Sequence, residues 1–136
     1  MFRTALISMF LTSTALADTW TVDDDGKADF DNIQDAIDAS SDGDEIVVMP
    51  GTYRSSANQV FNTLSKGVWI HSNEGPEITI IDGEETRRGI KCSPLESVET
   101  IIEGFMITNC YTTKNEGNGS GMYSSNSSPT LINCIF

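Results

Sequence analysis

Aspartates gathered near the N-terminus are the first residues whose spacing suggests chemistry. Asp23, Asp25, Asp29 and Asp31 surround a glycine, and alternating carboxylates around a glycine are typical of Ca²⁺-binding loops because Ca²⁺ prefers oxygen ligands. The pattern is incomplete, since Thr21 stands where such a loop would carry an acid and no glutamate closes an EF-hand. Asp31 is also suited to begin a helix. The segment predicts either a Ca²⁺ site with Asp23, Asp25 and Asp29 as ligands or an acidic turn.

A local basic cluster stands out in this acidic chain. It consists of Arg87, Arg88 and Lys91, and Asp82 and Glu84 precede it closely. Carboxylates and guanidinium groups can therefore share one site. The alternative is a solvated turn between two strands in which the charges balance one another.

The single histidine and the large aromatic residues give weaker signals. His71 cannot form a multi-histidine metal site alone, and no nucleophile for a catalytic triad can be identified, so we expect a surface residue at a strand end. Trp20, Trp69, Tyr53 and Tyr123 have rings that can stack on sugars. Core packing is the favoured interpretation for the tryptophans, whereas both roles stay open for the tyrosines, of which Tyr123 is a candidate for substrate binding.

A near repeat indicates how the chain is built. Asn109-Cys110 recurs as Asn133-Cys134, 24 positions later, each time after apolar residues. A short β unit with such a period is typical of a solenoid. Its coils stack and bury apolar side chains that a single coil would leave exposed to water. We expect the asparagines at left-handed corners and the cysteines stacked as small hydrophobic side chains in successive coils.

The three cysteines do not form a zinc or redox motif. None of the spacings between Cys92, Cys110 and Cys134 gives CxxC, and an odd number leaves one thiol without an internal partner. Export from the cytoplasm would permit a disulfide. The sequence therefore leaves their redox state open.

One amphipathic helix and many short strands must position these residues. Ile33 and Ile37 fall on one face of a helix over about 32–41, with Asp31 as N-cap and Gly43 as a left-handed stop. Short apolar runs separated by turn residues predict strands at 19–22, 45–49, 68–70, 78–81, 89–92, 100–102, 105–107, 121–123 and 130–132. Strands this short, together with a repeat, favour a parallel β-helix over an antiparallel sandwich.

These segments resemble a known family. Residues 30–37 and 43–53 resemble the N-terminal cap of pectin-lyase-like right-handed parallel β-helix proteins, and 80–83 and 119–134 resemble coils of bacterial secreted β-helix repeat proteins. The resemblance implies an all-β fold, a right-handed parallel β-helix (solenoid) with an N-terminal amphipathic capping helix. It says little about activity, because such caps occur in enzymes and in non-enzymatic surface proteins.

The resemblance also suggests roles for the charged cluster. Lyases of this family abstract a proton with an arginine or lysine beside bound Ca²⁺ and a uronate. That chemistry would make Arg87, Arg88 and Lys91 catalytic candidates, with Asp82 and Glu84 binding substrate beside Tyr123.

The domain organisation follows from the same pattern. Residues 1–17 resemble a secretory signal peptide, with a basic start, a short apolar stretch and an Ala-Leu-Ala cleavage site; the apolar stretch is shorter than the roughly 20 residues that span a bilayer. Residues 18–45 are expected to form a strand and the capping helix, and 46–136 the coils. Because the sequence ends within a predicted strand, we expect the β-helix to be incomplete at the C-terminus.

The net charge of the chain limits the classes of binding partner that we expect. A net charge of −12 disfavours nucleic acid and, unless Ca²⁺ bridges, acidic polysaccharides. The sequence predicts a secreted, periplasmic or cell-surface scaffold for a polysaccharide or cell-surface glycan, without a membrane span after cleavage, without a catalytic site in this stretch and without a required cofactor. The alternative is the N-terminal part of a polysaccharide lyase or pectinesterase-like enzyme. The ligand and the oligomeric state are left open.

Overall fold

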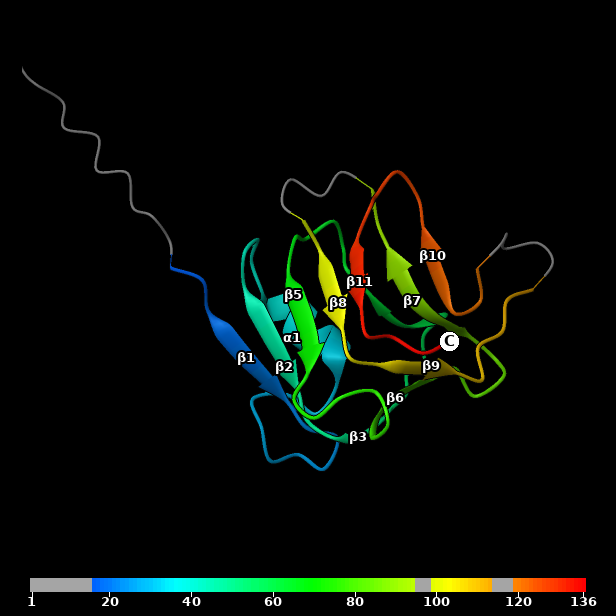
Figure 1. The fold of residues 1–136 in the computed structure, drawn as a ribbon, viewed down its shortest axis with the longest axis horizontal. Helices are drawn as coiled ribbons and strands as arrows, with labels where there is room; N and C mark the ends of the chain where they lie inside the picture. Colours follow the sequence, from blue (N-terminus) through cyan, green and yellow to red (C-terminus); the bar gives the residue numbers. More distant parts are fainter. Residues whose placement is uncertain (1–15, 95–98, 114–118) are drawn as a thin grey trace, which may run out of the picture.

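Parallel strands dominate the structure of this protein. The computed structural model describes residues 16–94, 99–113 and 119–136. The strands form three sheets stacked as a β-solenoid of about four turns, accompanied by one short helix (Figure 1). The predicted all-β parallel solenoid is therefore confirmed. The hand of its winding stays a prediction.

Each full coil contributes one strand to each of three sheets, and all pairs are parallel. Sheet A contains, in order, β1 (Thr19–Val22), β2 (Glu45–Val48), β5 (Trp69–Ser72), β8 (Ile101–Glu103) and β11 (Thr130–Ile132). Sheet B contains β3 (Gly51–Tyr53), β6 (Thr79–Asp82) and β9 (Met106–Thr108). Sheet C contains β4 (Gln59–Asn62), β7 (Arg88–Cys92) and β10 (Met122–Ser124).

Ladders of isoleucine fill the interior. Ile46, Ile70 and Ile102 pair in register across sheet A and are fully buried. Ile81 and Ile107 form an equivalent buried pair in sheet B. Neighbouring strands lie about 4.8 Å apart, so β-branched side chains of one coil rest on those of the next. This stacking provides the hydrophobic burial that no coil achieves alone.

The helix α1 (Ile33–Ala39) lies against β1, β2 and β4. Its buried residues are Ile33, Ala36 and Ile37, on the face that the helical period predicts. The N-cap is Asn32, whose side chain accepts a hydrogen bond from Asp35 N at 2.9 Å. The predicted N-cap was therefore wrong by one residue, because the helix begins at the first residue that must be buried.

The chain leaves the helix through an extended residue. Ser40 has φ −74° and ψ 162°, and its N–H donates to the carbonyl groups of Ala36 and Ile37. Gly43, the predicted left-handed stop, does adopt φ +91°, but it lies in the turn that follows. The helix thus ends earlier than the predicted residue 41.

Replacement of the N-cap tests this assignment. Asn32→Ala removes the acceptor for the Asp35 N–H and should lower the free energy of unfolding by about 1 kcal/mol. Asp31→Ala, at the position that the sequence pattern favoured, should change it by less than about 0.5 kcal/mol. Urea denaturation of both variants measures the difference, and an Asp31 effect equal to that of Asn32 would contradict the assignment.

The near repeat of 24 residues is not the period of the coil. Thr130 of β11 pairs with Ile101 of β8 in sheet A, whereas the strand before Asn109, β9, belongs to sheet B. Cys110 and Cys134 therefore follow strands of different sheets, and the predicted stacking of the two cysteines at equivalent positions is wrong. The coils vary in length, because residues in the loops between strands are added or removed without changing the stacked rungs.

The two asparagines predicted at corners have the expected backbone conformation, but they do not stack on each other. Asn109 and Asn133 adopt φ +50° and +48°, which confirms the left-handed corners. The strand register puts Gly83 below Asn109 and Gly104 below Asn133. Asparagine does not stack on asparagine here. Each is placed instead beside a residue that tolerates a tight corner equally well.

Candidate functional site

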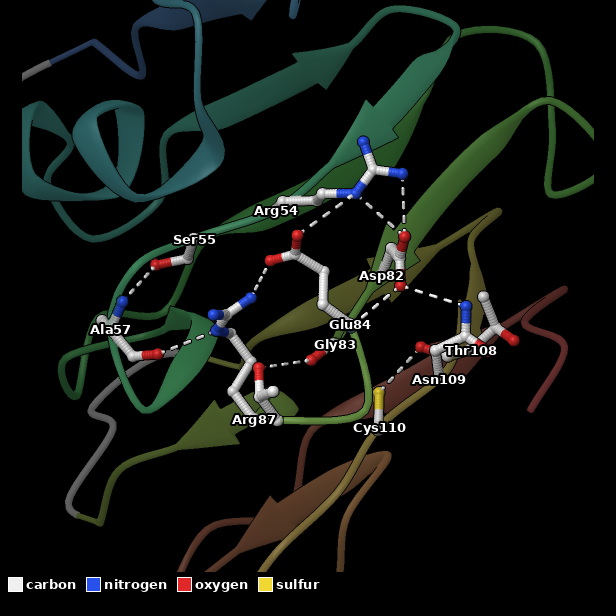
Figure 2. A network of polar contacts seen from close by, with 11 residues as sticks. Arg54, Ser55, Ala57, Asp82, Gly83, Glu84, Arg87, Thr108, Asn109 and Cys110 are labelled. Carbon is white, nitrogen blue, oxygen red and sulfur yellow. Dashed lines mark hydrogen bonds and ion pairs between the residues drawn. The ribbon is translucent and has the colours of Figure 1, made fainter.

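Three of the predicted site residues meet in one polar network. Asp82, Glu84 and Arg87 lie together with Arg54 and Asn109 at a corner of the solenoid (Figure 2). The network spans three coils because Asp82 ends β6, while Arg54 follows β3 and Asn109 follows β9. Parallel register brings these strand ends to the same level. The sequence had indicated the Asp82 to Arg87 segment, but not its partners on the neighbouring coils.

Asp82 is the centre of the network. Its Oδ2 accepts hydrogen bonds from Nε and Nη2 of Arg54, both at 2.9 Å. Its Oδ1 accepts from the backbone N–H of Glu84 at 2.9 Å and from Nδ2 of Asn109 at 3.2 Å. With only 7 % of Asp82 exposed, all four acceptor positions of the carboxylate are used within the protein. This carboxylate has little capacity left for an external ligand.

The environment keeps Asp82 charged. Burial by itself raises the pKa of this carboxyl, but the hydrogen bonds from Glu84 N, Asn109 and Arg54, together with the Arg54 charge, bring the pKa below its ordinary value. Asp82 is therefore ionised at neutral pH. Its chemistry is that of a paired structural carboxylate rather than of a general acid.

Arg87 is held by two partners in the same network. Its Nη1 forms an ion pair with Glu84, and its Nε donates to the carbonyl of Ala57 at 3.1 Å. Glu84 and Glu85 both adopt left-handed backbone angles, φ +52° and +57°, so the corner itself aims the Glu84 side chain back toward Arg87. The arginine joins the loop after β3 to the corner after β6.

The other basic candidates face different partners. Arg88 is only 8 % exposed; its Nε donates to Gly119 O at 3.0 Å, and its guanidinium lies 4.8 Å from the centroid of the Tyr123 ring. This cation–π contact links β7 to β10. Lys91, half-buried on β7, is the register partner of Tyr123. Arg87, Arg88 and Lys91 thus do not gather around one ligand position.

Asp29 forms hydrogen bonds with Thr21 at the outer edge of β1. Its Oδ2 accepts hydrogen bonds from the backbone N–H of Thr21 at 2.9 Å and from the Thr21 hydroxyl at 2.7 Å. These two bonds, the hydroxyl first, lower the pKa of Asp29. The backbone N–H of Phe30 then donates to Thr21 O at 3.1 Å. The segment that suggested Ca²⁺ binding therefore closes the outer edge of β1.

The neighbouring aspartates are engaged in the same turn. Asp25 forms an ion pair with Lys27, and Asp23 accepts a hydrogen bond from the backbone N–H of Asp25 at 3.3 Å. Among residues 16–94, 99–113 and 119–136, no three histidine, cysteine or acidic side chains lie close enough together to hold a metal ion. The Ca²⁺ interpretation of this turn stays a prediction.

A second group of polar residues lies on the outer side of sheet A, and we call it the Trp69 face. Its members alternate with the buried isoleucine ladder and therefore point outward. They come from four successive strands: Thr19, Glu45, Trp69, His71 and Glu103. Trp69 is 40 % exposed, so the expectation that it packs in the core was wrong. The Trp69-Ile70-His71 alternation was the signal that could have placed it outside.

Contacts on this face hold the indole in one orientation. The rings of Trp69 and His71 stack with centroids 4.2 Å apart, and Trp69 Nε1 donates to Glu103 Oε2 at 3.1 Å. His71 Nε2 lies 2.8 Å from Glu45 Oε1, and the Thr19 hydroxyl donates to Glu45 Oε2 at 3.0 Å. His71, expected at a strand end, thus lies within β5 as part of a ladder that crosses four strands.

Hydrogen bonding keeps the Glu45 carboxylate ionised. The bond from His71 is the strongest influence and lowers the pKa of Glu45; partial burial acts in the opposite direction, and the bond from Thr19 lowers the pKa further. Glu45 therefore carries a negative charge at neutral pH. The Trp69 face combines an exposed aromatic ring with charged acceptors.

Comparison with protein-family models, with curated proteins and with solved structures finds no match. The resemblance to pectin-lyase-like proteins therefore stays a prediction. In the part of the chain that the structure describes, no helix has the length and apolar character needed to cross a membrane. The proposed signal peptide falls almost entirely on residues 1–15, which lie outside the described residues.

Proposed function

We propose that this β-solenoid is a secreted or cell-surface scaffold that binds a polysaccharide or cell-surface glycan through the Trp69 face. The observation that carries the proposal is the 40 % exposure of Trp69 on the outer side of a five-stranded parallel sheet. An aromatic ring with one polar edge suits sugars, which present both apolar C–H faces and hydroxyl groups. The signal-like residues 1–17 support export.

The fixed orientation of the ring favours binding. His71 covers one side of the indole and Glu103 holds its N–H. A ligand therefore does not have to immobilise the side chain on arrival, and the entropic cost of association is lower. The ring stands on β5, which is hydrogen-bonded on both sides within sheet A, to β2 and to β8.

The other candidate residues support a scaffold rather than an enzyme. Asp82 is saturated by hydrogen bonds and Arg87 is paired with Glu84. These side chains join successive coils. These contacts stabilise the stacking of the coils in an elongated framework. We therefore place glycan recognition on the outer side of sheet A.

Binding to oligosaccharides tests the proposal. The full chain should bind at least one class in a panel of immobilised neutral, acidic and amino-sugar oligosaccharides, and Trp69→Ala should weaken that binding about 10-fold, or about 1.4 kcal/mol. Tyr111→Ala removes an aromatic residue that is 52 % exposed and lies outside the Trp69 face, so it should leave binding unchanged. Failure to bind any member of the panel would contradict the proposal, as would equal binding by Trp69→Ala.

A further inference from the structure

The chemistry of the Trp69 face points to a particular class of sugar. We infer that this face binds an amino sugar through its protonated amine, with the cation held between the Trp69 ring and the carboxylate of Glu103. The inference rests on the proposed function and deepens it by naming the ligand.

The first argument is the charge on this face. Elsewhere arginine neutralises carboxylates directly, as Arg54 does for Asp82 at 2.9 Å. Within the described part of the chain, Glu103 has no lysine, arginine or histidine within ion-pair distance, whereas Glu45 lies 2.8 Å from His71. The donor to Glu103 is the neutral indole N–H of Trp69. The face therefore retains negative charge for a cationic partner.

The second argument is the position of the Glu103 carboxylate beside the aromatic ring. Glu103 Oε2 accepts a hydrogen bond from Trp69 Nε1 at 3.1 Å, which places this carboxylate beside the edge of the ring. Glu45 is in register with Trp69, but its carboxylate contacts His71, which covers the other side of the indole, so a cation on the exposed side of the ring lies near Glu103. Each carboxylate oxygen can accept a further hydrogen bond beyond those it already receives, and an ammonium group has three donors.

The third argument is the ring itself. His71 covers one side of the Trp69 indole, so the exposed area of the ring lies on the opposite side and along its edge. Tryptophan is the aromatic side chain that attracts cations most strongly. The same surface packs against the apolar side of a sugar ring. A sugar that carries an ammonium group satisfies the aromatic and the acidic parts of the Trp69 face together.

An oligosaccharide pair that differs only in charge tests the inference. Isothermal titration calorimetry would compare the glucosamine hexamer, at a pH where its amines are protonated, with the N-acetylglucosamine hexamer and a galacturonate hexamer. We expect the glucosamine hexamer to bind at least 10-fold more tightly than the N-acetylated one and the galacturonate hexamer to bind most weakly. Added salt should weaken the first interaction most, because it screens exposed charges.

Variants separate binding at this face from general attraction to an acidic protein. Glu103→Gln keeps an oxygen acceptor for the Trp69 N–H but removes the charge, and it should weaken glucosamine binding about 5-fold; Trp69→Ala should weaken it about 10-fold. Glu85→Gln makes the same charge change at an exposed residue of the sheet B corner and should have no effect. Thermal melting of each variant checks that the fold is intact.

The outcomes distinguish this inference from the proposed function. Equal or tighter binding of the N-acetylated hexamer would overturn the amino-sugar inference and leave the glycan scaffold standing. Equal effects of Glu103→Gln and Glu85→Gln would also overturn it, as would a lysine hexapeptide that binds more tightly than the glucosamine hexamer. Binding of no oligosaccharide at all would overturn both.

Discussion

Replacing Ile102 by alanine is expected to lower the free energy of unfolding by roughly 3 to 4 kcal/mol. Ile102 is fully buried, and its register neighbours are Ile70 on one side and Leu131 on the other. Alanine would leave a cavity beside the buried Ile70, which the close-packed side chains of the interior cannot refill. Urea denaturation followed by circular dichroism measures the change.

The adjacent residue on the same strand provides a matched control. Ile101 is the outward neighbour of Ile102 on β8 and is only partly buried. Ile101→Ala should therefore cost less than half as much as Ile102→Ala, although both changes remove the same atoms. Equal losses would contradict the assignment of inner and outer faces of sheet A, and with it the outward direction of Trp69.

Asp82→Asn is expected to lower the free energy of unfolding by about 2 kcal/mol. The amide keeps the size of the side chain, but it cannot accept at both ends from Arg54, Glu84 N and Asn109. The donors of three coils then lose their shared charged acceptor, which is itself buried. Glu85→Gln, a change at the exposed neighbouring corner residue, should alter stability by less than about 0.5 kcal/mol.

The same variant should reveal the ionisation of Asp82. Because the folded-state pKa is lowered, the ionised carboxylate stabilises the fold above the pKa of the unfolded chain, about 3.9. That contribution is lost as the pH falls from there through the folded-state pKa. The stability difference between the native chain and Asp82→Asn should thus be largest near neutral pH and shrink below about pH 4. A difference that stays constant down to pH 2 would contradict the ionised network.

The sequence was most informative where apolar runs are continuous. β2, β5 and β8 were predicted to within a residue or two, because β-branched runs bounded by turn residues allow few alternatives. β3 and β4 were missed. Gly51 begins β3 directly after a proline, and such a pair is typical of a turn. β4 begins and ends with polar residues, Gln59 and Asn62, so it lacks an apolar run. Short strands inside a solenoid owe their conformation to the coils above and below them more than to local preference.

The candidate sites depended on register, which a single sequence does not reveal. Asp82 and Arg87 are close along the chain and were found together, whereas Arg54 and Asn109 reach Asp82 from separate coils. The Trp69 face was missed for the same reason, because its members come from different strands of sheet A. Because the coils differ in length, residues that contact each other in neighbouring coils are not separated by a constant number of positions in the sequence.

The sealed outer edge of β1 has a consequence for self-assembly. Parallel strands with free backbone groups can serve as templates for other chains, as in cross-β fibrils. At β1 the carboxylate of Asp29 occupies the Thr21 N–H, and Phe30 N–H occupies the Thr21 carbonyl. An incoming strand would have to displace both before it could pair. The solenoid is thus protected against templated polymerisation from this end, by a side chain that first suggested a metal ligand.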